Sequence, residues 1–216
     1  MEEVTPALVI EAYRHGLFPM AESRHARRLY WFDPEQRGII PLDAFHVSRS
    51  LRRRVRAAPF AIRIDTAFAE VMRGCADPAA GRRETWINDQ ILDLYGRLHA
   101  TGYAHSVECW EAEELVGGIY GVALGAAFFG ESMFGRRRDA SKIALVHLAA
   151  RLRAGGFRLF DIQYVTDHLR RFGAIEIDRA RYRRRLAEAL AVPADFYRLP
   201  VGSSPATVLQ SITQTS

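Results

Sequence analysis

The sequence predicts an α+β fold in which helices come first, an antiparallel sheet follows, and a helix then crosses to a further strand. Three features support this order. Capped amphipathic segments occur near both ends of the chain, residues 60–135 mix strand and helix signals, and a long apolar-striped segment precedes the strand-like "FRLFDIQ". With 216 residues, 49% of them hydrophobic, the chain is long enough to bury a sizeable core.

Residues 1–58 are expected to form a small N-terminal domain. A Thr-Pro pair predicts the start of a helix over residues 6–15, which a glycine then ends. After the break at "GLFPM", residues 46–57, "HVSRSLRRRVRA", predict a short basic helix, and Pro59 marks a boundary.

Residues 59–199 are expected to form the larger domain. "FAIRIDTAF" predicts a strand followed by a helix that Asp65 caps, and Asn88 is expected to cap the next helix. "AHSVECW" and "ELVGGIYGVALG" predict an antiparallel hairpin that turns between Glu111 and Glu114, and "AAFFGES" predicts a third strand.

The C-terminal third begins with the clearest helical pattern, over residues 141–154, which a Gly-Gly pair ends. "FRLFDIQ" predicts the strand that follows, and Thr166 and Asp178 are expected to cap two further helices. This order suits the half-open mixed sheet of acyltransferase-like proteins. The polar stretch 200–216 is expected to be a flexible tail.

Charge and cysteine content narrow the class of protein. The formal net charge is +5 and almost all of the positive charge is arginine, because Lys142 is the only lysine. An arginine-rich surface suits a polyanionic partner but does not demonstrate one. Cys75 and Cys109 form no CxxC pattern, and the chain has no apolar run typical of a signal peptide or membrane span. We therefore expect a cytoplasmic protein that is not attached to a membrane.

The strand "DIQ" places an acid and an amide on one face, because side chains alternate along a strand and Asp161 and Gln163 are two residues apart. One interpretation is a solvated strand end. The other is a polar pair at the mouth of a cleft, where a carboxylate holds a substrate ammonium group or accepts its proton.

Glu131 stands in "FFGESMFGRRRDASK", among aromatic residues in an apolar stretch that three arginines directly follow. It is either a paired structural acid or part of a site for an amphipathic ligand with a cationic group. In the second interpretation Phe128 and Met133 hold an apolar side chain, and the arginines that follow face something anionic.

Two further features each allow a structural and a functional interpretation. Arg49, Arg53 and Arg56 share one face of the predicted basic helix, which is either solvated or in contact with phosphates. Trp86, just before a predicted helix, is either buried in the core or stands at a cleft edge where it stacks on a nucleobase.

Other chemistries lack their motifs. The chain contains no HExxH, GxSxG or P-loop pattern, and its seven histidines show no metal-ligand spacing, so we expect no metal site. Cys109 is expected to be an inert core thiol. An acetyl-CoA-dependent acetyltransferase would need a glycine-rich pyrophosphate loop that "RRRDASK" lacks. A non-catalytic RNA-binding module would not need Asp161, Gln163 and Glu131 together on a cleft wall.

Taken in order, the segments of the chain resemble the leucyl/phenylalanyl-tRNA–protein transferase family from residue 8 to about residue 190. The matching segments are "AYRHGLFPM", "YWFDPEQRGIIP", "HVSRSLRRRVR", "ETWI", "AHSVECW", "LVGGIYGVALG", "FFGESMFGRRRDASK", "FDIQYVTDHLRRFGAIEI" and "RARYRRRL". The patterns "HxSRS", "LVGGxYGV" and "GESMFxRxxxASK" are together highly specific.

The resemblance implies a small N-terminal domain and an acetyltransferase-like catalytic domain. It implies an enzyme that moves leucine or phenylalanine from a charged tRNA to the α-amine of proteins that begin with arginine or lysine. Because an apolar pocket separates similar side chains only modestly, we expect methionine to be a secondary donor. The product would carry a destabilising N-terminal residue that marks it for proteolysis. No cofactor is implied, and we expect a monomer.

The resemblance also assigns roles to matching residues. Asp161, Gln163 and Glu131 correspond to the catalytic polar network. Trp86 corresponds to the residue that stacks near the terminal adenosine, and the helix-face arginines Arg49, Arg53 and Arg56 correspond to the tRNA contact. The donor side-chain pocket is assigned to Ile119, Phe128, Met133, Leu148 and Leu152.

Two residues depart from the family pattern. Met20 stands where many relatives have a tryptophan in "FPW", which puts stacking on that side of the adenosine in question. Ile162 replaces the middle cysteine of "DCQ"; because it faces away from the polar pair, we expect little effect.

Overall fold

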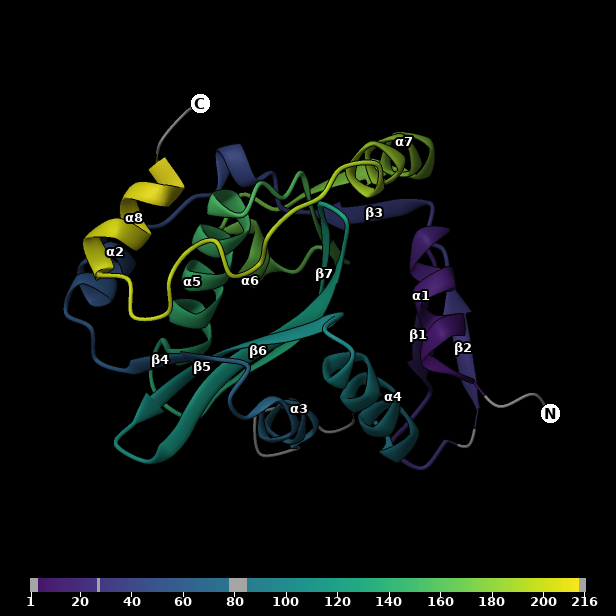
Figure 1. Cartoon of the computed structure of the whole chain (residues 1–216), viewed down its shortest axis with the longest axis horizontal. Coiled ribbons are helices and arrows are strands. Elements are labelled where there is room, and N and C mark those ends of the chain that lie inside the picture. The colour runs from purple at the N-terminus through teal and green to yellow at the C-terminus, as the bar shows by residue number, and fades with distance from the viewer. Residues whose placement is uncertain (1–3, 27, 78–84, 214–216) are drawn as a thin grey trace.

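A mixed sheet forms the centre of the molecule (Figure 1). The computed structural model describes residues 4–26, 28–77 and 85–213. The sheet has the order β4-β5-β6-β7-β8-β3-β9, and β7 and β8 are its parallel neighbours. The strands are β3 (Gln36–Ile39), β4 (Ala61–Ile64), β5 (Ala104–Glu111), β6 (Glu114–Leu124), β7 (Ala127–Gly135), β8 (Leu159–Gln163) and β9 (Ile175–Asp178). A separate hairpin consists of β1 (Phe18–Ala21) and β2 (Leu29–Phe32).

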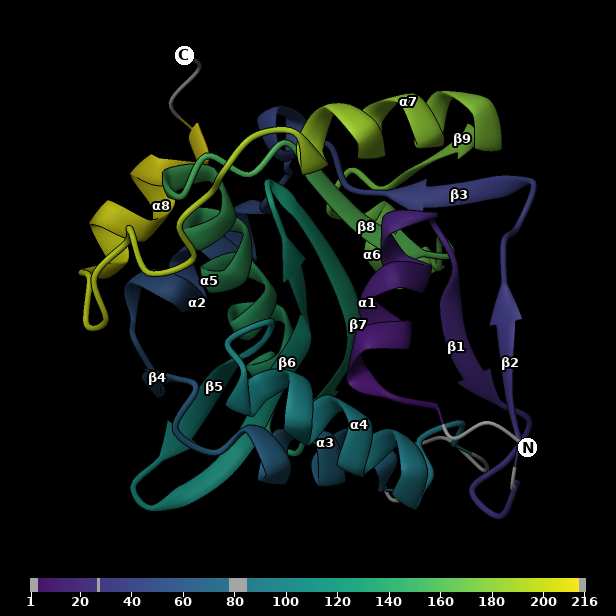
Figure 2. The same cartoon turned by 45° about the vertical axis from the view of Figure 1, so that its right-hand side comes forward.

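Helices cover both faces of the sheet (Figure 2). Buried residues of α2, α5 and α8 belong to the hydrophobic cluster on one face, and those of α1, α3, α4 and α7 to the cluster on the other. The helices are α1 (Pro6–Arg14), α2 (Arg49–Arg56), α3 (Phe68–Ala76), α4 (Asp89–Ala100), α5 (Ala140–Ala154), α6 (Asp167–Arg170), α7 (Arg179–Leu190) and α8 (Pro205–Thr213). Across the described ranges, none of the helices is both long and apolar enough to cross a membrane.

Local capping sets where most of these helices begin. The side chains of five N-cap residues accept a hydrogen bond from the backbone N–H three residues ahead. The predicted caps of α1, α4, α6 and α7 are confirmed, and α2 has one too; the five residues are Thr5, Asn88, Thr166, Asp178 and Ser48. The α+β class and the acidic hairpin turn between β5 and β6 are confirmed as well.

The predicted cap of α3 is wrong. Asp65 turns instead toward β5, where it accepts hydrogen bonds from the backbone of Ser106 and contacts the ring of His105. The buried carboxylate of Glu108, on β5, accepts from the backbone N–H groups of Thr66 and Ala67. The turn that leads into α3 is thus held from a neighbouring strand about 40 residues further along the chain, beyond the reach of local sequence rules, and α3 itself has no side-chain N-cap bond.

Four short strands were not predicted: β1, β2, β3 and β9. Each has four residues, too few for a clear alternating pattern. β3 lies between β8 and β9 in the sheet, although it belongs to the expected N-terminal domain, residues 1–58. The sheet therefore does not follow the expected division at residue 58.

The expectation of a flexible tail over residues 200–216 is wrong for Pro205–Thr213, which form α8. One face of α8 packs against α5 and α2, and its buried residues are Val208, Leu209 and Ile212. Residues at positions i, i+1 and i+4 lie on the same face of a helix. Arg153 of α5 donates hydrogen bonds to the carbonyls of Leu42 and Ile212 at 3.0 and 2.7 Å. Residues 214–216 lie outside the described part.

Truncating the apolar face of α8 tests this docking. We expect Leu209→Ala to lower the free energy of unfolding by about 2–4 kcal/mol, because a buried leucine is replaced and a void is left. Urea unfolding would measure the loss. The matched control is Gln210→Ala, an exposed neighbour expected to change stability by less than about 0.5 kcal/mol. Equal effects of the two would mean that α8 does not pack in solution.

Candidate active site

A cavity of about 660 Å³ opens between β1, the end of β7, the start of α5 and the segment that follows β8. Aromatic and thioether side chains form much of its wall, and carboxylate, amide, hydroxyl and imidazole groups complete it. Its size is typical of a small-molecule site. Its lining residues are Phe18, Pro19, Met20, Trp86, Glu131, Ser132, Met133, Phe134, Gly135, Ser141, Ile162, Gln163, Tyr164, Thr166, His168 and Leu169.

Asp161 lies directly behind this cavity in a buried ion pair. Its carboxylate is 0% exposed and faces the guanidinium of Arg37, 1% exposed, with Nη2 and Oδ2 2.7 Å apart and Nε 3.0 Å from Oδ1. Tyr182 donates to Oδ2 at 2.6 Å, and Arg37 Nη1 donates to the carbonyl of Gly16 at 2.9 Å. Although burial opposes the charge, Asp161 raises the pKa of Arg37. Asp161 is thus a satisfied buried anion.

Asp161 also shapes the backbone that presents Gln163 to the cavity. Gln163 has φ of 57°, a left-handed conformation unusual for a residue other than glycine, and its N–H donates to Asp161 Oδ1 at 2.8 Å. Gly38 of β3 lies alongside; a Cβ there would stand 2.8 Å from the backbone carbon of Tyr164, so only glycine fits. The backbone of Gln163 is therefore held in place by Asp161 and Gly38, which do not line the cavity.

Glu131 stands at the floor of the cavity, beside that amide. Tyr13 donates to its Oε1 at 2.6 Å, and Tyr95 OH lies 3.3 Å from Oε2 and 2.5 Å from Tyr13 OH. Gln163 Nε2 is 3.4 Å from Oε1. Burial, together with the nearby charge of Asp161, raises the pKa of Glu131 to about 7, against the lowering effect of the tyrosine hydrogen bonds. A carboxylate with this pKa can exchange a proton at neutral pH.

Comparison with known proteins matches nearly the whole chain. The family model for leucyl/phenylalanyl-tRNA protein transferase matches residues 39–187, and the model for the N-terminal domain of the same family matches residues 2–35. The chain belongs to this transferase family. Relatives with that name come from Maricaulis maris (60% identical, 96% of each chain covered), Paramagnetospirillum magneticum (63%, 92% of this chain and 95% of the relative) and Phenylobacterium zucineum (57%, 100% of each).

The cavity of the transferase brings together Glu131 and Gln163, with Asp161 behind them, as the sequence predicted for its polar network. The interpretation of Asp161 as part of a solvated strand end is wrong, since its side chain is completely buried. Trp86 and Met20 both line the same cavity. The ring of Trp86 can therefore contact a ligand in the cavity. Met20, which replaces the tryptophan of the family pattern, can contact the same ligand.

The five residues expected to form the donor side-chain pocket do not line the cavity together. Met133 lines it and also packs against the hydrophobic core. The other four are buried in that core, at 0–4% exposure: Ile119, Phe128, Leu148 and Leu152. Phe128 contacts the rings of Phe157, Phe160 and Phe196. Met133 therefore lies between the cavity and the core region that the sequence assigned to the donor, as do Ile162 and Leu169.

The three arginines that follow Glu131 in the sequence have different surroundings in the structure. Arg136 pairs with Asp77 at 3.7 Å, and Arg137 pairs with Glu111 and Glu114 at 2.9 and 3.0 Å. The expectation that all three face an anionic ligand is therefore wrong, because two of them are neutralised by acids of the protein. Arg138 is 91% exposed.

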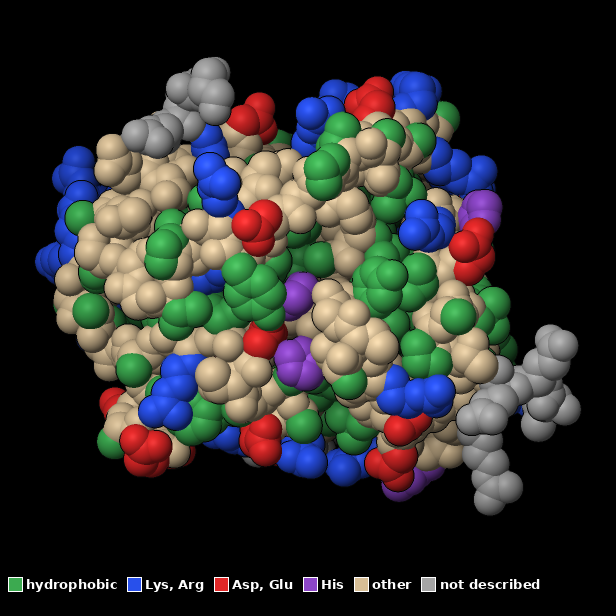
Figure 3. All heavy atoms as spheres, in the orientation of Figure 1, with side chains coloured by type: hydrophobic (Ala, Val, Ile, Leu, Met, Phe, Trp, Pro, Cys, Tyr) green, Lys and Arg blue, Asp and Glu red, His purple; other side chains and the backbone are tan. Residues whose placement is uncertain are grey.

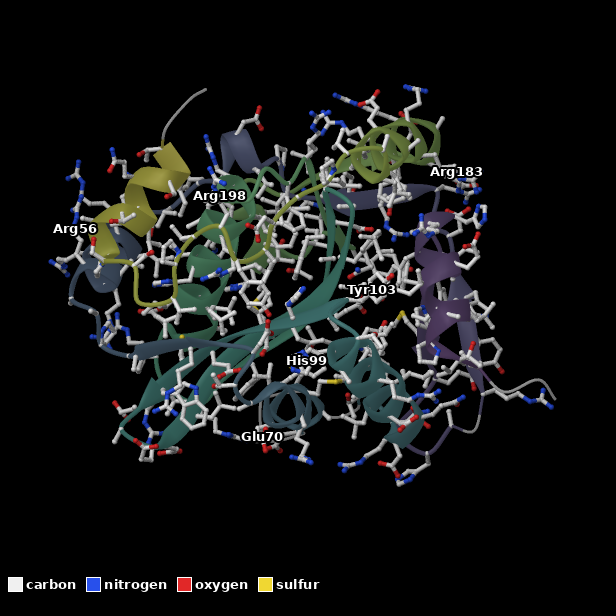
Figure 4. All side chains as sticks on the ribbon, viewed as in Figure 1. Arg56, Glu70, His99, Tyr103, Arg183 and Arg198 are labelled. Carbon is white, nitrogen blue, oxygen red and sulfur yellow. The ribbon has the colours of Figure 1, made fainter. Side chains whose placement is uncertain are left out.

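The arginines of the basic helix are exposed, as predicted. Arg49, Arg53 and Arg56 all point to solvent from α2. Basic side chains gather over the edge of the molecule where α2 lies (Figure 3), and Arg56 projects outward from that edge (Figure 4). Leu51 and Val55 of the same helix are buried, so the apolar face and the basic face are separate.

Sequence reasoning missed four residues of the transferase site: Arg37, Tyr182, Tyr13 and Tyr95. The first two hold Asp161 and the last two hold Glu131. The three tyrosines carried a signal, as polar-tipped residues on the apolar stripes of predicted helices, whereas Arg37 carried none. Within the described part of the chain, no three His, Cys, Asp or Glu side chains come together as a metal site.

Proposed function

We propose that the transferase moves leucine or phenylalanine, and more slowly methionine, from aminoacyl-tRNA to the N-terminal amine of proteins that begin with arginine or lysine. The names of the relatives support the donor class. The new N-terminal residue would mark the acceptor for proteolysis in the cytoplasm, with the enzyme acting as a monomer. The observation that carries the proposal is the Gln163 amide 3.4 Å from Glu131, on a backbone that Asp161 holds, in a cavity of nucleoside size.

The chemistry requires positioning more than activation. The donor is an ester, and the acceptor amine has a reference pKa of about 7.7–8.0, so part of it is neutral at pH 7. Holding the amine in contact with the ester carbonyl supplies much of the rate. In our proposal the Gln163 amide orients the amine, and Asp161 acts only as a positioning residue behind it.

Glu131 then handles the proton. The amine nitrogen attacks the ester carbonyl, a C–N bond forms, and the C–O bond to the ribose breaks. We assign to Glu131 the proton that the nitrogen loses, which it returns to the departing ribose oxygen. Its pKa of about 7 lies close to that of the amine, which is the match that efficient proton transfer needs.

The RNA end is assigned to the residues around the cavity. We propose that Trp86 stacks on the terminal adenine, and that the exposed arginines of α2, Arg49, Arg53 and Arg56, contact tRNA phosphates. Met20 would provide an apolar contact in place of a second stacking ring.

Transfer of radiolabelled leucine from leucyl-tRNA to a peptide beginning with arginine tests the proposal. We expect a labelled peptide with wild-type protein, and none when the peptide amine is acetylated. Binding of the tRNA without transfer would instead support a non-catalytic RNA-binding module. Acetylation of the peptide from acetyl-CoA would support the acetyltransferase alternative.

Met133 is expected to set donor preference, because it lies between the cavity and the apolar core. In Met133→Ala, the ratio of kcat/KM for phenylalanyl-tRNA to kcat/KM for leucyl-tRNA should rise about tenfold. The reason is that an apolar pocket discriminates between side chains by about 1–3 kcal/mol for each group that does not fit. Met20→Ala is the matched control: it should slow both donors alike. An unchanged preference in Met133→Ala would remove this residue from the donor pocket.

A further inference from the structure

A basic groove of about 760 Å³ adjoins the cavity, between α2, the start of α5 and the end of α6. Five cationic side chains line it: Arg53, Arg54, Arg138, Lys142 and Arg171. One carboxylate, Asp139, lines it as well. The cations come from three separate parts of the sequence, so the fold, and not one helix face, concentrates this charge. Arg49 and Arg56, which sequence reasoning singled out, are not among its lining residues.

The groove lacks enough acid to neutralise these cations. Asp139 is shared by Lys142 and Arg138, at 2.7 and 3.7 Å. Within the described ranges, Arg53, Arg54 and Arg171 have no ion-pair partner. A concave surface with one sign of charge attracts a ligand of the opposite sign.

Arg54 provides an independent indication of a ligand. Its Nε is buried, yet it has no hydrogen-bond partner among the described residues. A buried donor without an acceptor is unfavourable, and proteins rarely retain one. An anionic oxygen in the groove would supply the missing acceptor.

His168 connects the groove to the cavity, because its side chain lines both. Burial, and then the charges of Lys142 and Arg171, lower the pKa of His168, so the ring is neutral at neutral pH. A neutral ring can donate one hydrogen bond and accept another without adding charge. An extended ligand that leaves the cavity past His168 therefore enters the basic groove directly.

We propose that the basic groove binds the phosphodiester groups of the nucleotides that precede the terminal one, with the RNA strand passing over His168. This inference rests on the proposed function, which places the terminal nucleoside in the cavity. Guanidinium groups form paired hydrogen bonds with phosphate oxygens, and the groove is lined by the guanidinium side chains of Arg54, from α2, and Arg171, directly after α6.

Two donors of different length separate this inference from the proposed function. Leucyl-adenosine carries no phosphodiester, whereas a leucylated RNA trinucleotide carries two. We expect the wild-type enzyme to transfer leucine from both to an Arg-peptide, with a higher kcat/KM for the trinucleotide. Transfer from neither would contradict the proposed function itself. Equal kcat/KM for the two would leave that function intact and overturn the groove.

Arg54→Gln and Arg171→Gln test the assigned contacts. Each should lower kcat/KM for the trinucleotide roughly tenfold to a hundredfold, the usual effect of losing a charge-assisted hydrogen bond, and leave leucyl-adenosine within about twofold. The matched control is Arg184→Gln, an exposed arginine of α7 with the same change of charge, expected to affect neither donor. Loss with both donors, or with neither, would overturn the inference. So would an equal loss in Arg184→Gln.

Discussion

Arg37→Met is expected to destabilise the transferase by about 3–5 kcal/mol and to abolish transfer, because it leaves the Asp161 carboxylate buried without its counter-charge. The guanidinium also lies between the rings of Phe18 and Tyr182, 4.5 Å from each centroid, so its loss removes packing as well. Urea unfolding and the peptide transfer assay measure the two effects.

An exposed arginine provides the control for this change. Arg183, on α7, pairs with Asp33 at 2.7 Å, and its side chain is 57% exposed (Figure 4). Arg183→Met should change stability by less than about 1 kcal/mol, the usual range for a surface ion pair. A similar loss for both variants would mean that the Arg37–Asp161 pair is not specially important.

A double variant separates stability from catalysis. Arg37→Met combined with Asp161→Leu removes both charges, and replacing a buried pair by apolar groups is often nearly neutral. We expect most of the stability to return while transfer stays absent, because Gln163 loses the acceptor that holds its N–H. Recovery of transfer would contradict the positioning role of Asp161.

Glu131→Gln is expected to lower kcat for transfer by about 10²–10⁴, the usual contribution of a general base. Its pH profile is more informative than its rate. Glu131 should titrate near pH 7 and the amine near pH 8. The logarithm of the wild-type kcat/KM should therefore rise with a slope of about 2 below pH 7, where both groups lose a proton, and of about 1 above it, where only the amine still titrates. The variant should keep only the dependence that belongs to the amine.

Asp161→Asn is the companion to this experiment. Removing the negative charge behind the cavity should lower the pKa of Glu131, because Asp161 is one of the causes that raise it. The rate should fall, but the two-proton limb should remain and move to lower pH. If that limb disappeared in Asp161→Asn and persisted in Glu131→Gln, Asp161 would be the base.

The titration of Glu131 should also change the free energy of unfolding with pH. The pKa of Glu131 is raised on folding, from an ordinary value of 4.5 to about 7, so the folded state binds the proton more tightly. Its contribution is therefore fully present below about pH 4.5 and is lost as pH rises through 7, by roughly 3 kcal/mol. In Glu131→Gln this part of the pH dependence of unfolding should be absent.

Much of the local structure was predictable because it depends on contacts between near neighbours. Thr5, Asn88, Thr166 and Asp178 each cap a helix through a bond to the residue three positions ahead, and the sequence carries both partners. α3 shows the limit. The turn before it is held by Glu108, which lies on another strand, so the nearby Asp65 was the wrong choice.

The sequence by itself determined the α+β class, the starts of α1, α4, α6 and α7, the family and the polar trio Asp161, Gln163 and Glu131. Only the tertiary structure decided what these groups can do. Insertion of β3 beside β8 brings Arg37 to Asp161 across 124 positions of sequence, and burial, with the charge of Asp161 nearby, moves the pKa of Glu131 toward neutrality. The physical reason is that charge pairing and desolvation depend on which distant segments meet, whereas capping and periodicity depend only on residues a few positions apart.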